Sequence, residues 1–103
     1  MKTTLKGSQR KYLRGLAHAL KPVILIGHKG TTEPLSGALE EALEHHELVK
    51  VKFNDAKDKA DKTRMINDLQ RVTGADLVGT LGHTAIFYRV HPDPEKRKIK
   101  LPK

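Results

Sequence analysis

A short glycine-bounded segment carries the first chemical signal in this sequence. Residues 25 to 34 read LIGHKGTTEP, in which His28 and Lys29 lie between Gly27 and Gly30. An apolar run precedes these residues, and a pattern typical of a helix start follows them. Such a turn directs backbone N–H groups outward beside a helix N-terminus, which is how many proteins bind anions. The alternative is a plain strand-to-helix connection that needs positive φ at one of the glycines.

More positive charge falls on the helix predicted just before this turn. At about 100° per residue, five of its side chains form one stripe, which we expect to lie opposite an apolar face. These residues are Arg10, Lys11, Arg14, His18 and Lys21. The stripe is either part of a track for a polyanion or an ordinary solvated helix face. Because the following strand returns the chain to the glycine turn, we expect both features to share one surface.

Charge is distributed by region along the chain. The 103 residues carry a net charge of +8, which favours polyanionic partners. Residues 1–30 hold seven Lys or Arg and no acid, whereas residues 31–48 hold five acids and no Lys or Arg. The acidic helix should therefore face away from a polyanion. Further cationic or titratable positions that could extend the contact are Lys50, Lys52, His83, Lys96, Arg97 and Lys98.

Catalytic and metal-binding patterns are weak. The chain has no cysteine, which excludes disulfides and thiolate ligands. The densest histidine cluster is EHHE at residues 44–47, but adjacent helical side chains point about 100° apart, so we interpret these histidines as solvated. No nucleophile elbow, P-loop or carboxylate pair is present. We therefore expect no enzymatic activity, cofactor, metal or small-molecule substrate.

Periodicity predicts one α/β domain over residues 1–103 with the order αβαβαββ. We expect a first helix from about Gln9 to Leu20 with Ser8 as its N-cap, and a strand at residues 23–26 buried on both faces. Thr32 should cap a second helix, and Gly74 should end a third. The apolar positions assigned to the three helices are Tyr12, Leu13, Leu16, Ala17 and Leu20, then Leu35, Ala38, Leu39, Ala42 and Leu43, then Met65, Ile66, Leu69 and Val72.

The remaining strands follow from alternation and turn residues. Residues 49–53 alternate apolar side chains with Lys50 and Lys52, which predicts a strand with one wet face. Residues 77–81 and 84–89 should form a hairpin around Gly82 and His83. From about residue 91 a basic, proline-containing tail should be a flexible extension rather than core. No secretory signal or membrane span is recognisable, and we expect a cytoplasmic monomer.

Three segments resemble a known family. The stretches RKYLRGLAH, the KP-strand-GxxG-helix unit and HHELVKVK are similar to the CRM domain (chloroplast RNA splicing and ribosome maturation), in particular its bacterial stand-alone YhbY-like members. The resemblance runs from about residue 5 to residue 101. It implies a four-stranded mixed sheet with three helices, similar to the C-terminal domain of translation initiation factor three. It also implies association with precursor large (50S) ribosomal subunits, with 23S rRNA as the RNA partner.

The resemblance also implies positions for RNA contact. The family's RNA-contacting loop falls on Gly27, His28, Lys29 and Gly30, and its basic helix surface falls on Arg10, Lys11 and Arg14. Two departures are Pro34 at the helix start and His83 at a hairpin position that is often lysine. We therefore expect a protein that grips structured ribosomal RNA and assists large-subunit maturation. The alternatives are a regulator of another RNA, a translation-factor-like binder of the mature ribosome, and a protein-interaction adaptor that uses the acidic second helix.

Overall fold

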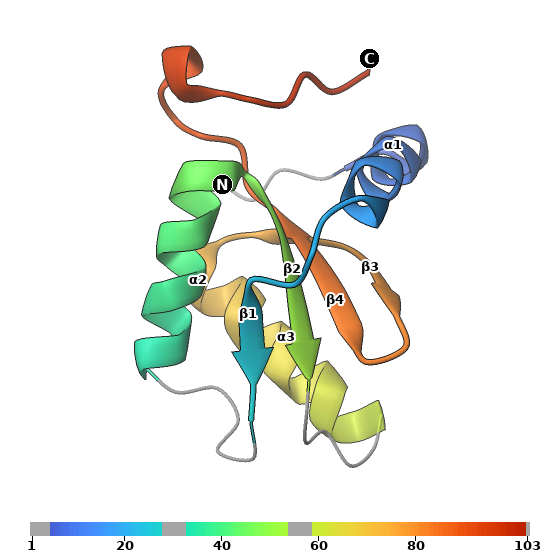
Figure 1. Cartoon of the computed structure of the whole chain (residues 1–103), viewed down its shortest axis with the longest axis vertical. Helices are drawn as coiled ribbons and strands as arrows, with labels where there is room; N and C mark the ends of the chain where they lie inside the picture. Colours follow the sequence, from blue (N-terminus) through green and yellow to red (C-terminus); the bar gives the residue numbers. More distant parts are fainter. Residues whose placement is uncertain (1–4, 28–32, 54–58, 103) are drawn as a thin grey trace.

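The computed structural model describes residues 5–27, 33–53 and 59–102. Their helices and strands follow the predicted αβαβαββ order (Figure 1). The elements are α1 (Gly7–His18), β1 (Ile24–Ile26), α2 (Glu33–His46), β2 (Leu48–Phe53), α3 (Lys59–Thr73), β3 (Asp76–Leu81), β4 (Thr84–Tyr88) and the short 3-10 helix η1 (Pro94–Lys96). Thr32, the predicted cap of the second helix, lies outside the described residues.

One mixed sheet joins the four strands in the order β1-β2-β4-β3. The β1 and β2 strands are parallel, and the other two pairs are antiparallel. The mixed sheet with three helices confirms the predicted fold class. The β3–β4 hairpin turns at Gly82 (φ 59°), which adopts the left-handed conformation that a tight turn favours.

The first face of the sheet is covered by α2 and α3. Buried side chains of both helices meet those of all four strands or the residues just before them, and Leu39, Leu69 and Phe87 are fully buried. Figure 1 shows α3 passing behind the sheet and α2 beside β1. Gly74 (φ 72°) ends α3 with a left-handed residue, as predicted, and its N–H donates to Gln70 O. This face holds the larger apolar core.

The second face is covered by α1 and the C-terminal tail. Leu13 and Ala17 of α1 pack with Val78, Ile86 and other apolar residues of the sheet. Residues Val90, Ile99 and Leu101 pack against the same cluster. The expectation of a flexible tail outside the core is therefore wrong for residues 98–101. Within the described part of the tail, η1 is the one regular element. Two apolar side chains and the hydrogen bonds described below hold the tail in place.

Two sequence-based expectations about the first helix and strand need correction. The helix begins at Gly7, and Ser8 is inside it; the Gln9 side chain instead accepts a hydrogen bond from the Lys6 N–H at 2.9 Å. The first strand is an edge strand with the burial pattern buried, exposed, buried, so it is not buried on both faces. Leu25 is 57% exposed because no described element covers it on the α1 side.

Some residues assigned to apolar helix faces are exposed. In α1, Tyr12 and Leu16 are 42% and 38% exposed, and Leu20, just beyond the helix, is also exposed. In α3, Val72 is exposed, whereas Ile66 and Leu69 are buried. The buried strip of each helix is therefore narrower than its apolar pattern. A single flat sheet face can contact only a narrow strip of a helix, so the flanking apolar residues stay at the surface.

Candidate nucleic-acid interface

The basic side chains of α1 lie beside its buried face. Arg10, Lys11 and His18 are exposed, and so is Lys21 in the connection to β1. Arg14 is also exposed, but part of its side chain lies against Gly79 of β3: a Cβ atom built on Gly79 would be 3.1 Å from Arg14 Cδ. The basic stripe therefore lies beside the buried residues Leu13 and Ala17, and Arg14 contacts the sheet. The expectation that the stripe lies opposite the core is wrong.

Two lysines extend this positive region across the same sheet face. Lys50 and Lys52 of β2 alternate with Val49, Val51 and Phe53, which are buried on the α2/α3 side. Lys50 Nζ donates to Leu20 O at 3.0 Å and so ties β2 to the end of the α1 segment. Lys52 is exposed. The predicted wet face of this strand is confirmed, and it is the face that carries α1.

The cationic tail adds to the α1 side. Lys96, Arg97 and Lys98 are all exposed. The tail is fixed close to α1, since Gln9 Nε2 donates to Pro102 O at 3.0 Å. Arg97 also has a structural contact, because its Nε donates to His91 O at 2.8 Å. The end of the tail is therefore held beside α1, whereas Lys98 is held near the end of α2, where its N–H donates to Glu47.

The glycine turn is described only at its first residue. Gly27 follows β1 directly and is exposed. Its φ is not in the left-handed region, and a Cβ atom there would meet nothing within 4 Å. Neither positive φ nor close packing inside the protein explains a glycine at this position. His28, Lys29 and Gly30 lie outside the described residues. His83 is exposed in the β3–β4 turn, and its carbonyl accepts from the Phe53 N–H.

The α2/α3 side has a different charge balance. Arg64 pairs with Asp61 and Arg71 pairs with Asp68 along α3, each at about 3 Å. On α2, Glu40, Glu41 and Glu44 are exposed. The sheet thus separates a strongly cationic side, formed by α1, β2 and the tail, from a side where acids and paired cations predominate.

Arg89, at the end of β4, was not identified from the sequence. Its side chain is only 18% exposed and forms ion pairs with Glu40 and Glu44 of α2. It also donates to Thr73 O at 2.7 Å and thereby joins β4, α2 and α3. Its place directly after a strand and before the tail gives no signal of this role in the sequence. Arg89 therefore neutralises part of the acidic helix.

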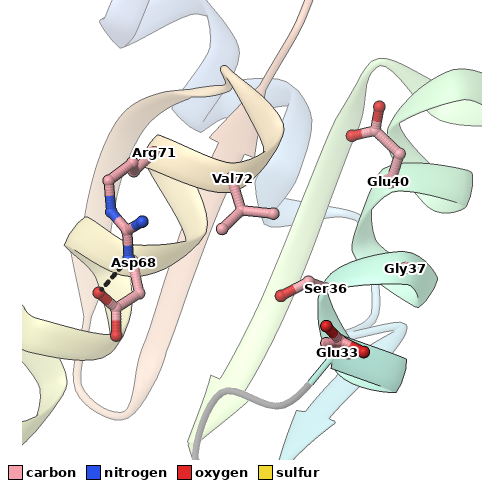
Figure 2. A pocket seen from close by; sticks show the side chains of 7 residues that line it. All are labelled: Glu33, Ser36, Gly37, Glu40, Asp68, Arg71 and Val72. Carbon is pink, nitrogen blue, oxygen red and sulfur yellow. Dashed lines mark hydrogen bonds and ion pairs between the residues drawn. The ribbon is translucent and has the colours of Figure 1, made fainter.

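A groove lies between α2 and α3 on this side. Figure 2 shows Val72 of α3 pointing toward α2, with Asp68 and Arg71 paired on α3. The groove has a volume of about 560 Å³. Glu40, at one end, is paired with Arg89. Its lining residues are Glu33, Ser36, Gly37, Glu40, Asp68, Arg71 and Val72.

Glu47 is the clearest case of a residue that the sequence pattern misplaces. It is one of the five acids that give the second helix its acidic character in the sequence, but it is 1% exposed and adopts φ 61° just after α2 ends. Its carboxylate accepts hydrogen bonds from the N–H groups of His91 (2.7 Å), Lys98 (2.6 Å) and Ile99 (3.0 Å). Helices commonly end in a left-handed residue, but glycine or asparagine is usual there, so a glutamate gave no signal.

Two buried residues, Tyr88 and His91, interact with Glu47. Burial raises the pKa of the Tyr88 phenol above its ordinary value of 10.0, and the Glu47 carboxylate raises that pKa further. His91 is buried, and its Nε2 lies 2.9 Å from Glu44 Oε2. In contrast, His45 and His46 are exposed, as predicted for the EHHE segment. Glu47 therefore differs from its neighbours in being a structural acid.

The described residues offer neither a metal site nor a membrane span. In residues 5–27, 33–53 and 59–102, no group of three or more His, Asp or Glu side chains is arranged to hold a metal ion. Of the helices that the structure describes, none has the length and apolarity to cross a membrane. Among the described residues, the cations that have no acidic partner named above gather on the α1 side.

Comparisons with known proteins agree with this architecture. An RNA-binding protein from Haemophilus influenzae is 45% identical over 101 residues, which are 98% of this chain and 98% of the relative. A probable RNA-binding protein from Bacillus subtilis is 33% identical over 98 residues, covering 95% and 99% of the two chains. The solution structure of a Staphylococcus aureus protein with a suggested RNA-binding role superposes with a TM-score of 0.79, at 31% identity, over 96% of this chain and 100% of that one. The family model of the CRS1 / YhbY (CRM) domain matches residues 5–89, and the chain belongs to this family.

Proposed function

We propose that this protein binds structured ribosomal RNA through the phosphate backbone and, as a cytoplasmic monomer without catalytic activity, assists maturation of the large ribosomal subunit. The observation that carries the proposal is the separation of charge across the sheet. Arg10, Lys11 and Lys21 are exposed on one side, whereas the cations Arg64 and Arg71 on the other side are paired with acids. Relatives named as RNA-binding proteins support RNA as the polyanion.

The mechanism is electrostatic and geometric. Exposed cations on α1 neutralise phosphates and release counterions, which makes the affinity depend on salt. Gly27 supports a close approach of the RNA backbone where β1 ends, because nothing in the described structure needs a glycine there. Phosphate contacts position a protein without reading bases. Binding by this surface alone is therefore expected to tolerate changes of RNA sequence.

Two double variants with the same loss of charge test which side binds. Arg10→Ala/Lys11→Ala removes two cations from the α1 side, and Arg64→Ala/Arg71→Ala removes two from the α3 side. With roughly 0.7 to 0.9 per phosphate contact, the first variant should reduce the magnitude of the negative slope of log affinity against log salt by about 1.4 to 1.8. The second should leave the slope nearly unchanged. Equal slopes for the two variants would contradict the proposal.

The ribosomal target needs a cellular measurement. Crosslinking the full chain to RNA in cells, followed by mapping of the crosslinked nucleotides, should place it on 23S rRNA. Sedimentation should show the protein with precursor large subunits and not with mature ones. Crosslinks confined to other RNAs would leave RNA binding intact and overturn the ribosomal role. Cosedimentation with mature subunits would favour the translation-factor-like alternative.

A protein-interaction adaptor is the second candidate, and the α2/α3 groove is the observation in its favour. Val72 is 56% exposed there between two helices. However, Glu40 is paired with Arg89 and Asp68 with Arg71, which reduces the attraction for a basic partner. If the groove binds a ribosomal protein, Val72→Ser should remove that protein from purified complexes while RNA affinity stays unchanged. Complexes of unchanged composition would count against the adaptor.

A further inference from the structure

An exposed row of side chains crosses the sheet on the α1 side. The strand register places Leu25 of β1 opposite Lys52 of β2, Lys52 opposite Thr84 of β4, and Thr84 opposite Leu81 of β3. Leu25 is 57% exposed and Leu81 is 74% exposed. Two aliphatic residues therefore end a row that has a lysine and a threonine at its centre.

The packing of the fold does not account for these two leucines. Neither belongs to the apolar cluster beneath α1, which uses Val78 and Ile86 from the neighbouring strands. In the next row, Val23 pairs with Lys50 through a backbone hydrogen bond of 3.1 Å and is itself 56% exposed. An open sheet face that exposes several large aliphatic residues around lysines indicates a contact surface.

Charge complementarity selects the occupant. Lys50 and Lys52 stand between the aliphatic residues, so a ligand must offer apolar surface and negative charge at alternating points. Unpaired nucleotides do so, because each has a base with an apolar face and a phosphate. A duplex offers mainly phosphates and groove edges, and gives Leu25 and Leu81 little to cover. A second copy of this chain would bring lysine against lysine.

The width of the four-stranded sheet also matches a contact with two or three nucleotides. Neighbouring strands lie about 4.8 Å apart, so the row from Leu25 to Leu81 spans about 14 Å. In RNA-recognition motifs a four-stranded sheet of this width receives two or three bases on aromatic side chains. Here the contacts are aliphatic and therefore weaker per base.

We propose that the row Leu25–Lys52–Thr84–Leu81 binds unpaired nucleotides that adjoin an RNA duplex. This proposal rests on the proposed RNA-binding function and names its substrate class: a junction between a duplex and a single strand. The duplex phosphates meet Arg10 and Lys11 on α1. The bases of the adjoining strand lie on the aliphatic residues, and Lys52 neutralises their phosphates. Arg14, which lies against Gly79 in the adjacent row, connects the two parts of the surface.

The test compares two RNAs that share one stem, one blunt and one with a short unpaired extension at either end. The wild-type chain should prefer the extended RNA. Leu25→Ser/Leu81→Ser should remove this preference, with a loss of roughly tenfold for the extended RNA and almost none for the blunt one. Val72→Ser, which changes an aliphatic residue about as exposed as Leu25 on the other side of the sheet, is the control and should change neither affinity.

Resonances of the leucine methyl groups provide a second readout that does not depend on the variants. The methyl signals of Leu25 and Leu81 should shift on addition of the extended RNA and not the blunt RNA. No preference in the wild type, or an equal loss for both RNAs in the double variant, would overturn the junction proposal. Loss of self-association or of a copurified protein in the double variant, without change in RNA affinity, would also overturn it.

The outcomes separate this proposal from the function on which it rests. If the wild type binds both RNAs equally and with a steep salt dependence, RNA binding stands and the junction proposal fails. If it binds neither RNA, or binds them without salt dependence, the proposed function itself fails. Circular dichroism and thermal unfolding of each variant establish that it is folded, which is expected because the substituted residues are exposed.

Discussion

The two faces of the sheet are covered in different ways. On the α2/α3 face, two helices of 14 and 15 residues bury apolar side chains along the whole sheet. On the α1 face, a 12-residue helix covers one part, and the tail closes another part through Glu47. The row of the sheet that contains Leu25 and Leu81 is not covered by α1 or the tail, and both leucines are exposed. The first face provides most of the apolar stabilisation, and the second combines a smaller core with a surface available for binding.

The largest effect should come from removing the acid that holds the tail. Glu47→Ala leaves three backbone N–H groups without their acceptor, so we expect a loss of roughly 3 kcal/mol or more in the free energy of unfolding. Urea denaturation measures it. Glu41→Ala, an exposed acid on the preceding helix, is the control and should change stability by no more than about 0.5 kcal/mol. Similar small losses in both variants would mean that Glu47 does not hold the second face together.

Truncation after His91 should have the next largest effect. The change removes Ile99 and Leu101 from the smaller core and two donors from Glu47, so we expect a loss of about 2 to 3 kcal/mol in unfolding free energy. A flexible extension, as expected from the sequence, would instead leave the stability of the truncated chain nearly unchanged. Lys100→Ala, which removes charge but no packed side chain, should leave stability unchanged. A truncated chain as stable as the wild type would restore the interpretation of the tail as a free extension.

Gly27→Ala should have the smallest effect on stability and a clear effect on binding. The backbone there is compatible with alanine, and the added Cβ meets nothing, so unfolding free energy should rise by about 0.4 to 1 kcal/mol. RNA affinity should fall several-fold if the RNA backbone approaches this glycine closely. Titration with the blunt stem RNA measures the change. Unchanged affinity would remove Gly27 from the interface and leave binding to α1, β2 and the tail.

Much of the fold could be predicted from local patterns. Alternation in residues 49–53 marked both a strand and its wet face, and Gly74 marked the end of α3. These signals depend on one element or one residue at a time. The edge position of β1 did not follow from its apolar run, because a short run of β-branched residues looks the same at an edge and in the centre of a sheet.

The candidate site was predicted less completely. The cations of α1 were found because net charge and helical spacing are visible in the sequence. Their position beside the buried strip, and the contact of Arg14 with Gly79, depend on which residues of α1 face the sheet. The row from Leu25 to Leu81 could not be predicted, since it exists only through the register of four strands. The role of Glu47 depends on backbone groups 44 to 52 residues away.

That separation has a consequence for synthesis of the chain. At about 5 to 20 residues per second, Lys98 and Ile99 are added roughly 3 to 10 seconds after Glu47, which they follow by 51 and 52 residues. During this interval the carboxylate must remain hydrated, and the core under α1 lacks Ile99 and Leu101 as its cover. The apolar core of the α2/α3 face contains no residue beyond β4 and can assemble first. The nascent protein therefore acquires its α1 side in its final form only when the tail reaches Glu47.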